Sequence, residues 1–163
     1  MYVIKRNGNR EIVSFDKILQ RIKNTGNECG IQINYTTLTM KVIDQLYDGI
    51  PTMKIDELTA EQCATLSTLH PEYITLASYI TVSNIHKNTR DSFYQTIKML
   101  YENKNGNFIQ SPLVSHELMK IVTNYKEAFE TMIQYKRDYL IEYFGLKTLE
   151  YSYLMKINGK IKS

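Results

Sequence analysis

The sequence predicts a mainly α-helical, α+β protein that opens with a small β-hairpin, and three observations support this. Two short β-branched runs, Val3-Ile4 and Ile12-Val13, flank a polar segment that contains Asn7-Gly8. From residue 15 onward, apolar residues recur at intervals of three and four, which is the spacing of one face of a helix. A hydrophobic content of 43% in 163 residues is enough for a packed core in one domain, or in one small domain with part of another.

The hairpin is predicted from Asn7-Gly8, because both residues accept the positive φ that a tight turn needs. A helix should follow directly, since Ser14 can cap it. Lys5 and Arg6 on the first strand and Lys17 on the helix would then converge near exposed backbone N–H groups. Cations beside a helix N-terminus favour the binding of phosphate.

Two helices are predicted between the hairpin and residue 50. The first should end near residue 24, because Gly26 and Gly30 follow. Asn34 can cap the second, which Gly49 and Pro51 should end. The expected buried faces are Phe15, Ile18, Leu19 and Ile22 in the first helix, and Leu38, Val42 and Leu46 in the second.

Two further helices are predicted up to about residue 101. Asp56 is well placed to cap the third helix, after a short connector that contains Thr52. His70-Pro71 breaks the chain again, and the proline suits the first turn of a long fourth helix over residues 71–101. The expected inner faces are Leu58, Thr65, Leu66 and Leu69 in the third helix, and Tyr73, Leu76, Ala77, Ile80 and Asn84 in the fourth.

Lys87 falls on the apolar stripe of the fourth helix when the count is continued from Asn84. A lysine on such a stripe is unusual, because its charge must find a partner or reach water. Two interpretations stay open. Lys87 can extend past the end of the bundle into solvent, or it can point at the anion that Lys5 and Lys17 face.

The rest of the chain is predicted to be a linker followed by short helices and a final turn. Residues 102–107 are polar and lack periodicity. Ser111-Pro112 should start a helix by the cap-then-proline order, with further helical pieces up to about residue 154. The face of that helix would be Val114, Leu118, Ile121, Val122 and Tyr125. Asn158-Gly159 predicts a hairpin whose second strand is very short, which suggests a fragment or a chain that something else completes.

Composition argues against several classes of protein. The formal charge of +3 is mild and no dense Lys/Arg run occurs, so a nucleic-acid coat protein is not suggested. No apolar stretch approaches the roughly 20 residues of a membrane span, and the chain opens with a strand pattern rather than a signal peptide. Cys29 and Cys63 lie far apart without metal-ligand spacing, so reduced thiols in a cytosolic protein and no metal site are expected.

The chain also carries an ordered set of motifs. The first part contains Val3-Ile4-Lys5-Arg6-Asn7-Gly8, Phe15-Asp16-Lys17-Ile18, Tyr47-Asp48-Gly49, Asp56-Glu57-Leu58, His70-Pro71-Glu72-Tyr73 and Val82-Ser83-Asn84-Ile85-His86-Lys87. The second contains Arg137-Asp138-Tyr139, Tyr143-Phe144-Gly145-Leu146-Lys147-Thr148-Leu149-Glu150 and Ser152-Tyr153-Leu154-Met155-Lys156-Ile157-Asn158-Gly159-Lys160. In this order they resemble the N-terminal part of the large subunit of class I ribonucleotide reductase, of the eukaryotic and large-DNA-virus type.

This resemblance implies that residues 1–91 form an ATP-cone, a small β-cap on a four-helix bundle that binds ATP as activator or dATP as inhibitor. Residues 92–112 would be the end of the long helix and a linker. Residues 113–163 would be the N-terminal helical segment of the reductase large chain, truncated before the catalytic barrel. The radical cysteine and the redox cysteines of the family have no counterpart here. No catalytic residues, no redox cofactor and no activity of the chain alone are therefore expected.

The resemblance also implies a binding site for ATP or dATP, with Mg²⁺ on the phosphates. Carried over by position, the phosphates would be held by Lys5, Arg6, Lys17 and Lys87. The segment that wraps the nucleotide would be Glu11, Ile12, Val13, Ser14, Phe15, Asp16 and Lys17, with Thr52 and Asp56 on its sugar and base side. The walls of the adenine pocket would be Val3, Val13, Ile18, Val42 and Leu46. Plainer roles stay open for two residues: Asp56 as a helix N-cap, and Glu11 as a solvated strand end.

The partners that the resemblance implies are ATP or dATP, the rest of the reductase large chain, the small radical-generating subunit and further copies in a homo-oligomer, all in the cytoplasm. No nucleic acid or membrane is expected. One alternative is a split-gene or assembly fragment that docks onto the remaining reductase polypeptide without binding nucleotide. A cone-containing transcriptional repressor is disfavoured, because its zinc ribbon needs CxxC pairs. The last alternative is a helical domain without a ligand.

Overall fold

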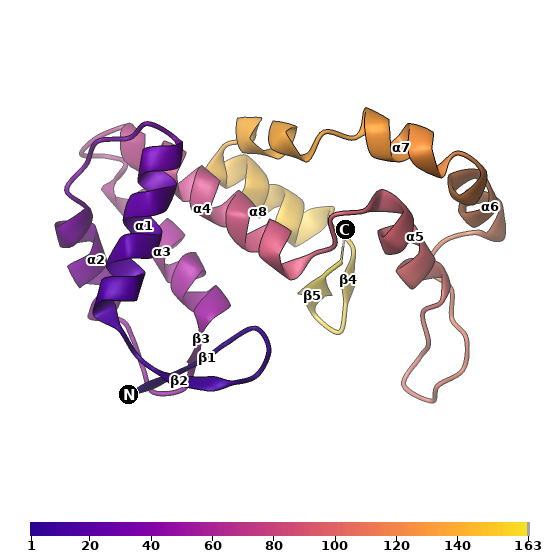
Figure 1. Ribbon diagram of the computed structural model, residues 1–163, viewed down its shortest axis with the longest axis horizontal. Coiled ribbons are helices and arrows are strands. Elements are labelled where there is room, and N and C mark those ends of the chain that lie inside the picture. Colours follow the sequence, from indigo (N-terminus) through magenta and orange to yellow (C-terminus); the bar gives the residue numbers. More distant parts are fainter. Residues whose placement is uncertain (163) are drawn as a thin grey trace. The chain divides into compact units, whose positions relative to one another are not determined.

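The computed structural model describes residues 1–162, and these form two compact units. Unit 1 contains Met1–Ile85 and Tyr139–Ser152, and unit 2 contains His86–Asp138 and the described residues from Tyr153 onward. The chain is mainly helical with a few short strands, which confirms the predicted fold class (Figure 1). The domain boundaries that the sequence predicts, after residues 91 and 112, stay predictions. Within residues 1–162, no helix is long and apolar enough to cross a membrane.

Unit 1 begins with a three-stranded sheet in the order β2-β1-β3 (Figure 1). β1 (Tyr2–Ile4) and β2 (Arg10–Ile12) are antiparallel, which confirms the predicted hairpin. β3 (Ile50–Pro51) lies parallel to β1 and was not predicted. β3 is only two residues long and ends in proline, so the sequence shows no alternating strand pattern there. Its extended conformation depends on pairing with β1, which is distant in sequence.

The hairpin turn is wider than the predicted tight turn. Its closing hydrogen bond runs from Lys5 N to Asn9 O at 2.8 Å, and a second runs from Gly8 N to Lys5 O at 2.9 Å. Gly8 has a φ of +84°, whereas Asn7 does not adopt a positive φ. The loop therefore projects beyond the ends of both strands and carries Lys5 at its base.

The first two helices begin where the sequence predicts. α1 (Phe15–Glu28) is capped by Ser14 and α2 (Tyr35–Ile43) by Asn34, and both caps accept a backbone N–H in the first turn. The predicted end of α1 near residue 24 is wrong, because Gly26 lies inside the helix and packs against the Tyr35 ring of α2. The predicted end of α2 is also wrong, since the helix stops several residues before the Gly-Pro segment.

α3 (Thr52–Leu66) starts earlier than predicted, and the expected role of Asp56 as its N-cap is wrong. The N-cap is Pro51, whose extended backbone belongs to β3, so the chain enters the helix directly from the sheet. Asp56 consequently lies in the second turn and is buried. Of the predicted inner face, Leu66 is buried, whereas Leu69 follows the helix and is 77% exposed.

The predicted single helix over residues 71–101 is two helices. α4 (Glu72–Asn88) and α5 (Phe93–Tyr101) are separated by a short segment that ends in Ser92. The Ser92 side chain accepts from Gln95 N and so starts a new helix. The predicted inner stripe of α4 is otherwise correct, since Leu76, Ala77, Ile80 and Asn84 are buried.

The core of unit 1 is built from the sheet and the helices α1 to α4. α8 (Tyr143–Ser152) adds Tyr143, which is 5% exposed and packs against this core. The side chains that form its centre are Ile22, Leu38, Val42, Ile50, Cys63 and Leu76, each at most 2% exposed. Each buried aliphatic side chain of this size contributes about 1.5–3 kcal/mol relative to exposure, so the core holds the hairpin and the helix starts in place.

Unit 2 consists of short helices and a small hairpin. Its elements besides α5 are α6 (His116–Asn124), α7 (Lys126–Met132), β4 (Lys156–Ile157) and β5 (Lys160–Ile161). The 3₁₀ helix η1 (Tyr135–Leu140) contains the boundary at which the chain passes from unit 2 to unit 1. Packing centres on Ile97, Leu100 and Val122, which are buried.

One prediction for unit 2 is wrong and one is confirmed. α6 does not start at Ser111-Pro112 but after Ser115, whose Oγ accepts from Leu118 N at 3.1 Å. A serine followed three residues later by a helical N–H serves as the cap, and proline is not required. The hairpin at Asn158-Gly159 is confirmed, with φ values of 51° and 73° that match a two-residue primed turn.

Gly26→Ala is expected to destabilise the folded chain by about 1–3 kcal/mol, because an added Cβ overlaps the Tyr35 ring and the ring must move. Urea unfolding followed by circular dichroism measures the change. Gly106→Ala is the control, since nothing lies within 4 Å of a Cβ there. Equal stability of the Gly26→Ala variant and the wild-type chain would contradict the packing described for α1 and α2.

Cys63 is expected to be inert in the folded chain. It is fully buried, and burial raises the pKa of its thiol to about 12, so that roughly one thiol in ten thousand is ionised at pH 8. Ellman's reagent should therefore modify Cys63 only after denaturant is added, and the Cys63→Ser variant should lose that late reaction. Rapid modification of two thiols in the native chain would show that this part of the core opens readily.

Candidate functional site

Glu11 joins the two lysines that the sequence predicts at the start of α1. Lys5 lies directly after β1, Glu11 lies in β2 opposite Val3, and Lys17 lies in the first turn of α1. The Lys5 Nζ is 3.1 Å from Glu11 Oε2, and the Lys17 Nζ binds Glu11 Oε1. Hydrogen bonds from Lys17 and then Lys5 lower the pKa of Glu11, so the carboxylate is ionised at neutral pH.

The residues between Glu11 and Lys17 connect β2 to α1. Ser14 Oγ accepts from Lys17 N at 3.3 Å and fixes the first turn of the helix. Ile12, Phe15 and Asp16 are exposed, whereas Val13 is half-buried against the core. The segment therefore offers exposed side chains and a helix N-terminus close to two cations.

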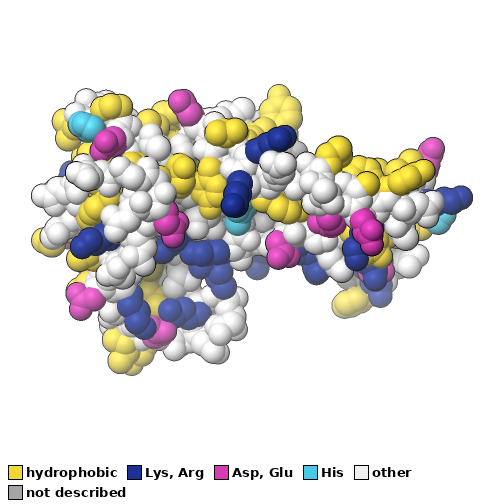
Figure 2. All heavy atoms as spheres, turned by 45° about the horizontal axis from the view of Figure 1, so that its top comes forward, with side chains coloured by type: hydrophobic (Ala, Val, Ile, Leu, Met, Phe, Trp, Pro, Cys, Tyr) yellow, Lys and Arg dark blue, Asp and Glu magenta, His cyan; other side chains and the backbone are white. Residues whose placement is uncertain are grey.

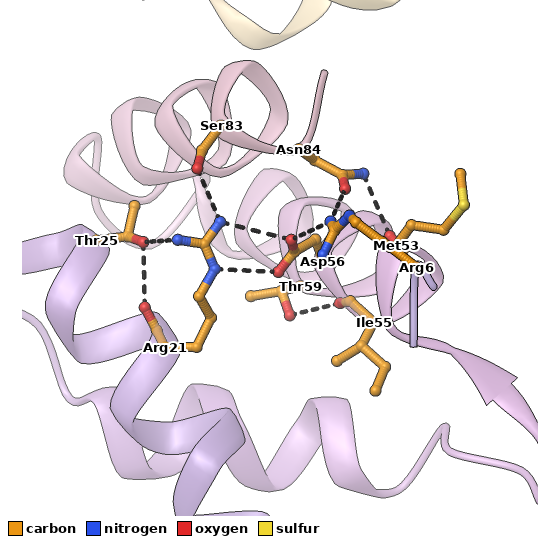
Figure 3. A network of polar contacts seen from close by, with 9 residues as sticks. All are labelled: Arg6, Arg21, Thr25, Met53, Ile55, Asp56, Thr59, Ser83 and Asn84. Atoms are coloured by element: carbon orange, nitrogen blue, oxygen red, sulfur yellow. Dashed lines mark hydrogen bonds and ion pairs between the residues drawn. The ribbon is translucent and has the colours of Figure 1, made fainter. Parts of the chain in front are cut away.

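A second cluster surrounds the buried carboxylate of Asp56 (Figure 3). Arg6 approaches Asp56 Oδ2 with one guanidinium nitrogen at 3.3 Å. Arg21 of α1 approaches both oxygens, with Nε 3.4 Å from Oδ1 and a terminal nitrogen 3.5 Å from Oδ2. A buried carboxylate needs such partners, because its charge is costly to remove from water.

The same two arginines extend the network to other helices. Arg21 donates to Ser83 Oγ of α4 at 2.9 Å and to Thr25 Oγ1 of α1 at 3.1 Å. Arg6 donates to Asn84 Oδ1 at 2.7 Å. The Asn84 amide in turn donates to the backbone carbonyl of Met53, at the start of α3, at 3.2 Å (Figure 3). These hydrogen bonds connect the hairpin loop, α1, α3 and α4. Thr52, the residue before Met53, is half-buried.

Arg21 is the residue of this site that sequence reasoning missed. The signal was present, because Arg21 lies four residues after Lys17 and four before Thr25, on one face of α1. The sequence prediction for α1 rested on its apolar stripe alone and assigned no role to Arg21. The buried position of Asp56, which the predicted cap role obscured, is what gives Arg21 its partner.

Carboxylates offset part of the positive charge around the hairpin. Glu11 lies between two lysines and Asp56 between two arginines, so each cluster keeps a formal charge of +1. In the space-filling view, basic and acidic side chains lie next to one another over the N-terminal hairpin (Figure 2). This arrangement suits an anion that can replace a carboxylate as the partner of a cation.

The predicted adenine walls belong largely to the core of unit 1. Val3, Ile18 and Val42 are buried, and Leu46 packs half-buried against them. Their role toward a base stays a prediction. Lys87 lies exposed in the last turn of α4, in unit 2, and its predicted role toward an anion likewise stays a prediction. Among residues 1–162, no group of His, Cys, Asp and Glu side chains is arranged to hold a metal ion.

Comparison with known proteins gives consistent matches. The family model of the ATP cone domain matches residues 1–88. The chain is 45% identical over 170 aligned residues to the ribonucleoside-diphosphate reductase large subunit of Variola virus, 44% to that of Dictyostelium discoideum and 45% over 166 to that of Danio rerio. Each alignment covers 99% of this chain but only 21%, 19% and 20% of the respective relative, so the chain spans about a fifth of their length.

Arg21→Met is expected to destabilise unit 1 by roughly 1–3 kcal/mol, because Asp56 would keep one arginine while remaining buried. The expected loss of stability is at the lower end for a buried ion pair, because the Arg21 side chain is 30% exposed and water screens its charge. Arg21→Lys should recover part of the loss through its charge. Arg10→Met, at an exposed position of β2, is the control for urea unfolding. A stability equal to that of the wild-type chain would mean that Asp56 does not depend on Arg21.

Proposed function

Since the chain belongs to the ATP cone domain family, we propose that it is an allosteric module that binds ATP and dATP and regulates a ribonucleoside-diphosphate reductase. The observation that carries the proposal is the meeting of Lys5 and Lys17 beside the N-terminus of α1. The likeness to reductase large subunits over 99% of this chain supports the choice of enzyme.

The phosphates of the nucleotide are proposed to bind Lys5, Lys17 and the first-turn N–H groups of α1. Ammonium groups form short charge-assisted hydrogen bonds to phosphate, and the helix dipole adds a favourable field for an anion. Arg6, at the base of the same loop, is a further phosphate ligand in this proposal. Mg²⁺ would bind chiefly to phosphate oxygens and water rather than to a protein cage.

The sugar is proposed to lie near Asp56 and Thr52, at the start of α3. A carboxylate offers about four acceptor positions, and three guanidinium N–H groups reach that of Asp56. Room therefore remains for one hydrogen bond from a ribose hydroxyl. ATP and dATP differ in a single hydroxyl, and a site distinguishes them only where its presence or absence changes such a pairing.

The base is proposed to lie between the segment after Glu11 and the edge of the core. Ile12, Val13 and Phe15 provide apolar surface that is at least partly exposed, and Leu46 is half-buried. The deeper residues Val3, Ile18 and Val42 would then support these side chains from behind, in keeping with their burial.

Regulation would proceed by a shift between arrangements of the whole enzyme. ATP and dATP would favour different arrangements, and the effect is limited by their differential affinity for each. The proposed partners are the remainder of the large chain, the radical-generating small subunit and further copies of the large chain, in the cytoplasm. Because the chain spans a fifth of its relatives, the reductase reaction itself is assigned to the remainder.

Docking onto the remaining reductase polypeptide, without binding nucleotide, is a second candidate function. It is favoured by the exposure of large aromatic side chains in α8, where Phe144 is 64% and Tyr151 87% exposed. Co-purification of the chain with the remaining polypeptide should be lost in Phe144→Ser and kept in Lys5→Ala. Loss in both variants, or in neither, would not fit this candidate.

Lys5→Ala is expected to weaken ATP and dATP binding by roughly tenfold or more, since a hydrogen bond to a charged group is worth about 1.5–3 kcal/mol. Isothermal titration calorimetry on the full chain measures both affinities. Lys23→Ala, an exposed lysine on α1, is the matched control and should bind as the wild-type chain does. Absence of ATP binding to the folded wild-type chain would refute the proposed function.

A further inference from the structure

Arg21 contacts both oxygens of the Asp56 carboxylate. Its Nε lies 3.4 Å from Oδ1 and one terminal nitrogen lies 3.5 Å from Oδ2, so the guanidinium group meets the carboxylate side-on. In Figure 3, Arg21 and Arg6 lie on either side of Asp56, and Arg6 approaches Oδ2 with one nitrogen at 3.3 Å. A planar guanidinium group that contacts both oxygens fixes the plane of a carboxylate, which a contact from a single nitrogen does not.

The orientation of the Asp56 carboxylate depends on such contacts. The last torsion of an aspartate side chain joins an sp³ carbon to an sp² carbon, and its energy wells are broad, so the side chain itself favours no sharply defined plane. Asp56 lies in the second turn of α3 and its side chain is 10% exposed, so water competes little for its oxygens. The direction of its remaining acceptor positions is therefore set by the two arginines, and chiefly by Arg21.

The Arg21 guanidinium group is held in turn by two hydroxyl groups. One terminal nitrogen donates to Ser83 Oγ of α4 at 2.9 Å, and the other donates to Thr25 Oγ1 of α1 at 3.1 Å. The Thr25 hydroxyl donates to the Arg21 backbone carbonyl at 3.1 Å, and Thr25 is 2% exposed. These contacts restrict the guanidinium group, so α1 and α4 together determine how the carboxylate on α3 is oriented.

The oriented carboxylate lies next to the place proposed for the sugar. Thr52 lies four residues before Asp56, so the two side chains lie on one face of α3, one turn apart. A hydrogen bond weakens steeply as its angle departs from linear, so its strength depends on where the acceptor positions point. A misoriented carboxylate would accept poorly from the one hydroxyl that distinguishes ATP from dATP.

We infer that Arg21 is a positioning residue for nucleotide discrimination: it orients Asp56 and thereby sets the ratio of the ATP affinity to the dATP affinity. This inference rests on the proposed function and deepens it. Arg21 acts through Asp56 and does not need to touch the nucleotide. A merely structural role would change both affinities by the same factor, whereas a positioning role changes their ratio.

The test measures the ATP and dATP affinities of the full chain by isothermal titration calorimetry, for the wild-type chain, Arg21→Lys and Arg21→Met. Lysine keeps the charge but has a single nitrogen, so it cannot reproduce the side-on contact with both oxygens. Both variants are expected to move the affinity ratio about threefold or more toward one, the size expected when one hydrogen bond to a charged group is weakened. Ser83→Ala removes one anchor of Arg21 and should move the ratio in the same direction by a smaller factor.

Gly26→Ala is the matched control for a loss of stability. It lies on the same helix as Arg21, and it is expected to destabilise the chain to a similar extent by displacing Tyr35. Its affinity ratio should equal that of the wild-type chain.

Asp56→Asn tests whether Arg21 acts through the carboxylate. With asparagine at this position, the further change Arg21→Lys should leave the affinity ratio as it is in the single variant, because the group that Arg21 orients has lost its charge. A shift of the ratio that persists beside Asp56→Asn would mean that Arg21 acts on the nucleotide by another route, and it would overturn the inference.

The other outcomes separate the inference from the proposed function. Equal binding of ATP and dATP by the wild-type chain, an unchanged ratio in both Arg21 variants, or a shift that Gly26→Ala shares would overturn the inference and leave the proposed function standing. A folded wild-type chain that binds neither nucleotide refutes the proposed function, and the inference falls with it. If Arg21→Met does not fold, Arg21→Lys and Ser83→Ala decide by the same criteria.

Discussion

The structure of unit 1 depends on the pairing of one buried carboxylate with two arginines. Asp56 lies on α3, Arg21 on α1, and Arg6 on the loop after β1, so a single charge joins three elements that are distant in sequence. The loop from Lys5 to Asn9 lies beyond the paired strands and is closed by its own backbone hydrogen bonds. The ion pairs fix its base, and with it the position of Lys5 relative to α1.

Local signals predicted the beginning of the fold well and its tertiary parts poorly. Ser14 and Asn34 were identified as caps because a cap requires only a side-chain oxygen next to a helical pattern. β3 and the early start of α3 were missed because pairing with β1, almost fifty residues away, determines them. The wrong N-cap role of Asp56 follows from the misplaced start of α3. An aspartate in the second turn looks like an N-cap when the helix is thought to begin after it.

In the candidate site, too, some residues were predictable from local sequence and others only from the tertiary structure. Lys5, Lys17 and Glu11 were named from motifs at the start of the chain, and the structure places them together. Arg21 was missed, because its spacing from Lys17 and Thr25 on α1 does not reveal its partners on α3 and α4. The depth at which Val3, Ile18 and Val42 lie in the core was not predictable either, since periodicity gives a buried face but not how much of it a ligand can reach.

The hydrogen bond from Arg6 to Asn84 spans 78 positions of the chain, and the parallel pairing of β1 with β3 spans almost fifty. During synthesis β1 therefore has only β2 as a partner until β3 has been made, and the hydrogen bond from Arg6 to α4 can form only once Asn84 has been made. At synthesis rates of about 5–20 residues per second, β3 follows β1 by roughly 2–9 s and Asn84 follows Arg6 by roughly 4–16 s. During that time a short, partly apolar edge is open to other chains, and hairpins alone are marginally stable in water. The β1–β2 hairpin, which is made before the rest of unit 1, thus completes its pairing only after β3 and α4 have followed, and chaperone occupancy of nascent unit 1 should be concentrated there.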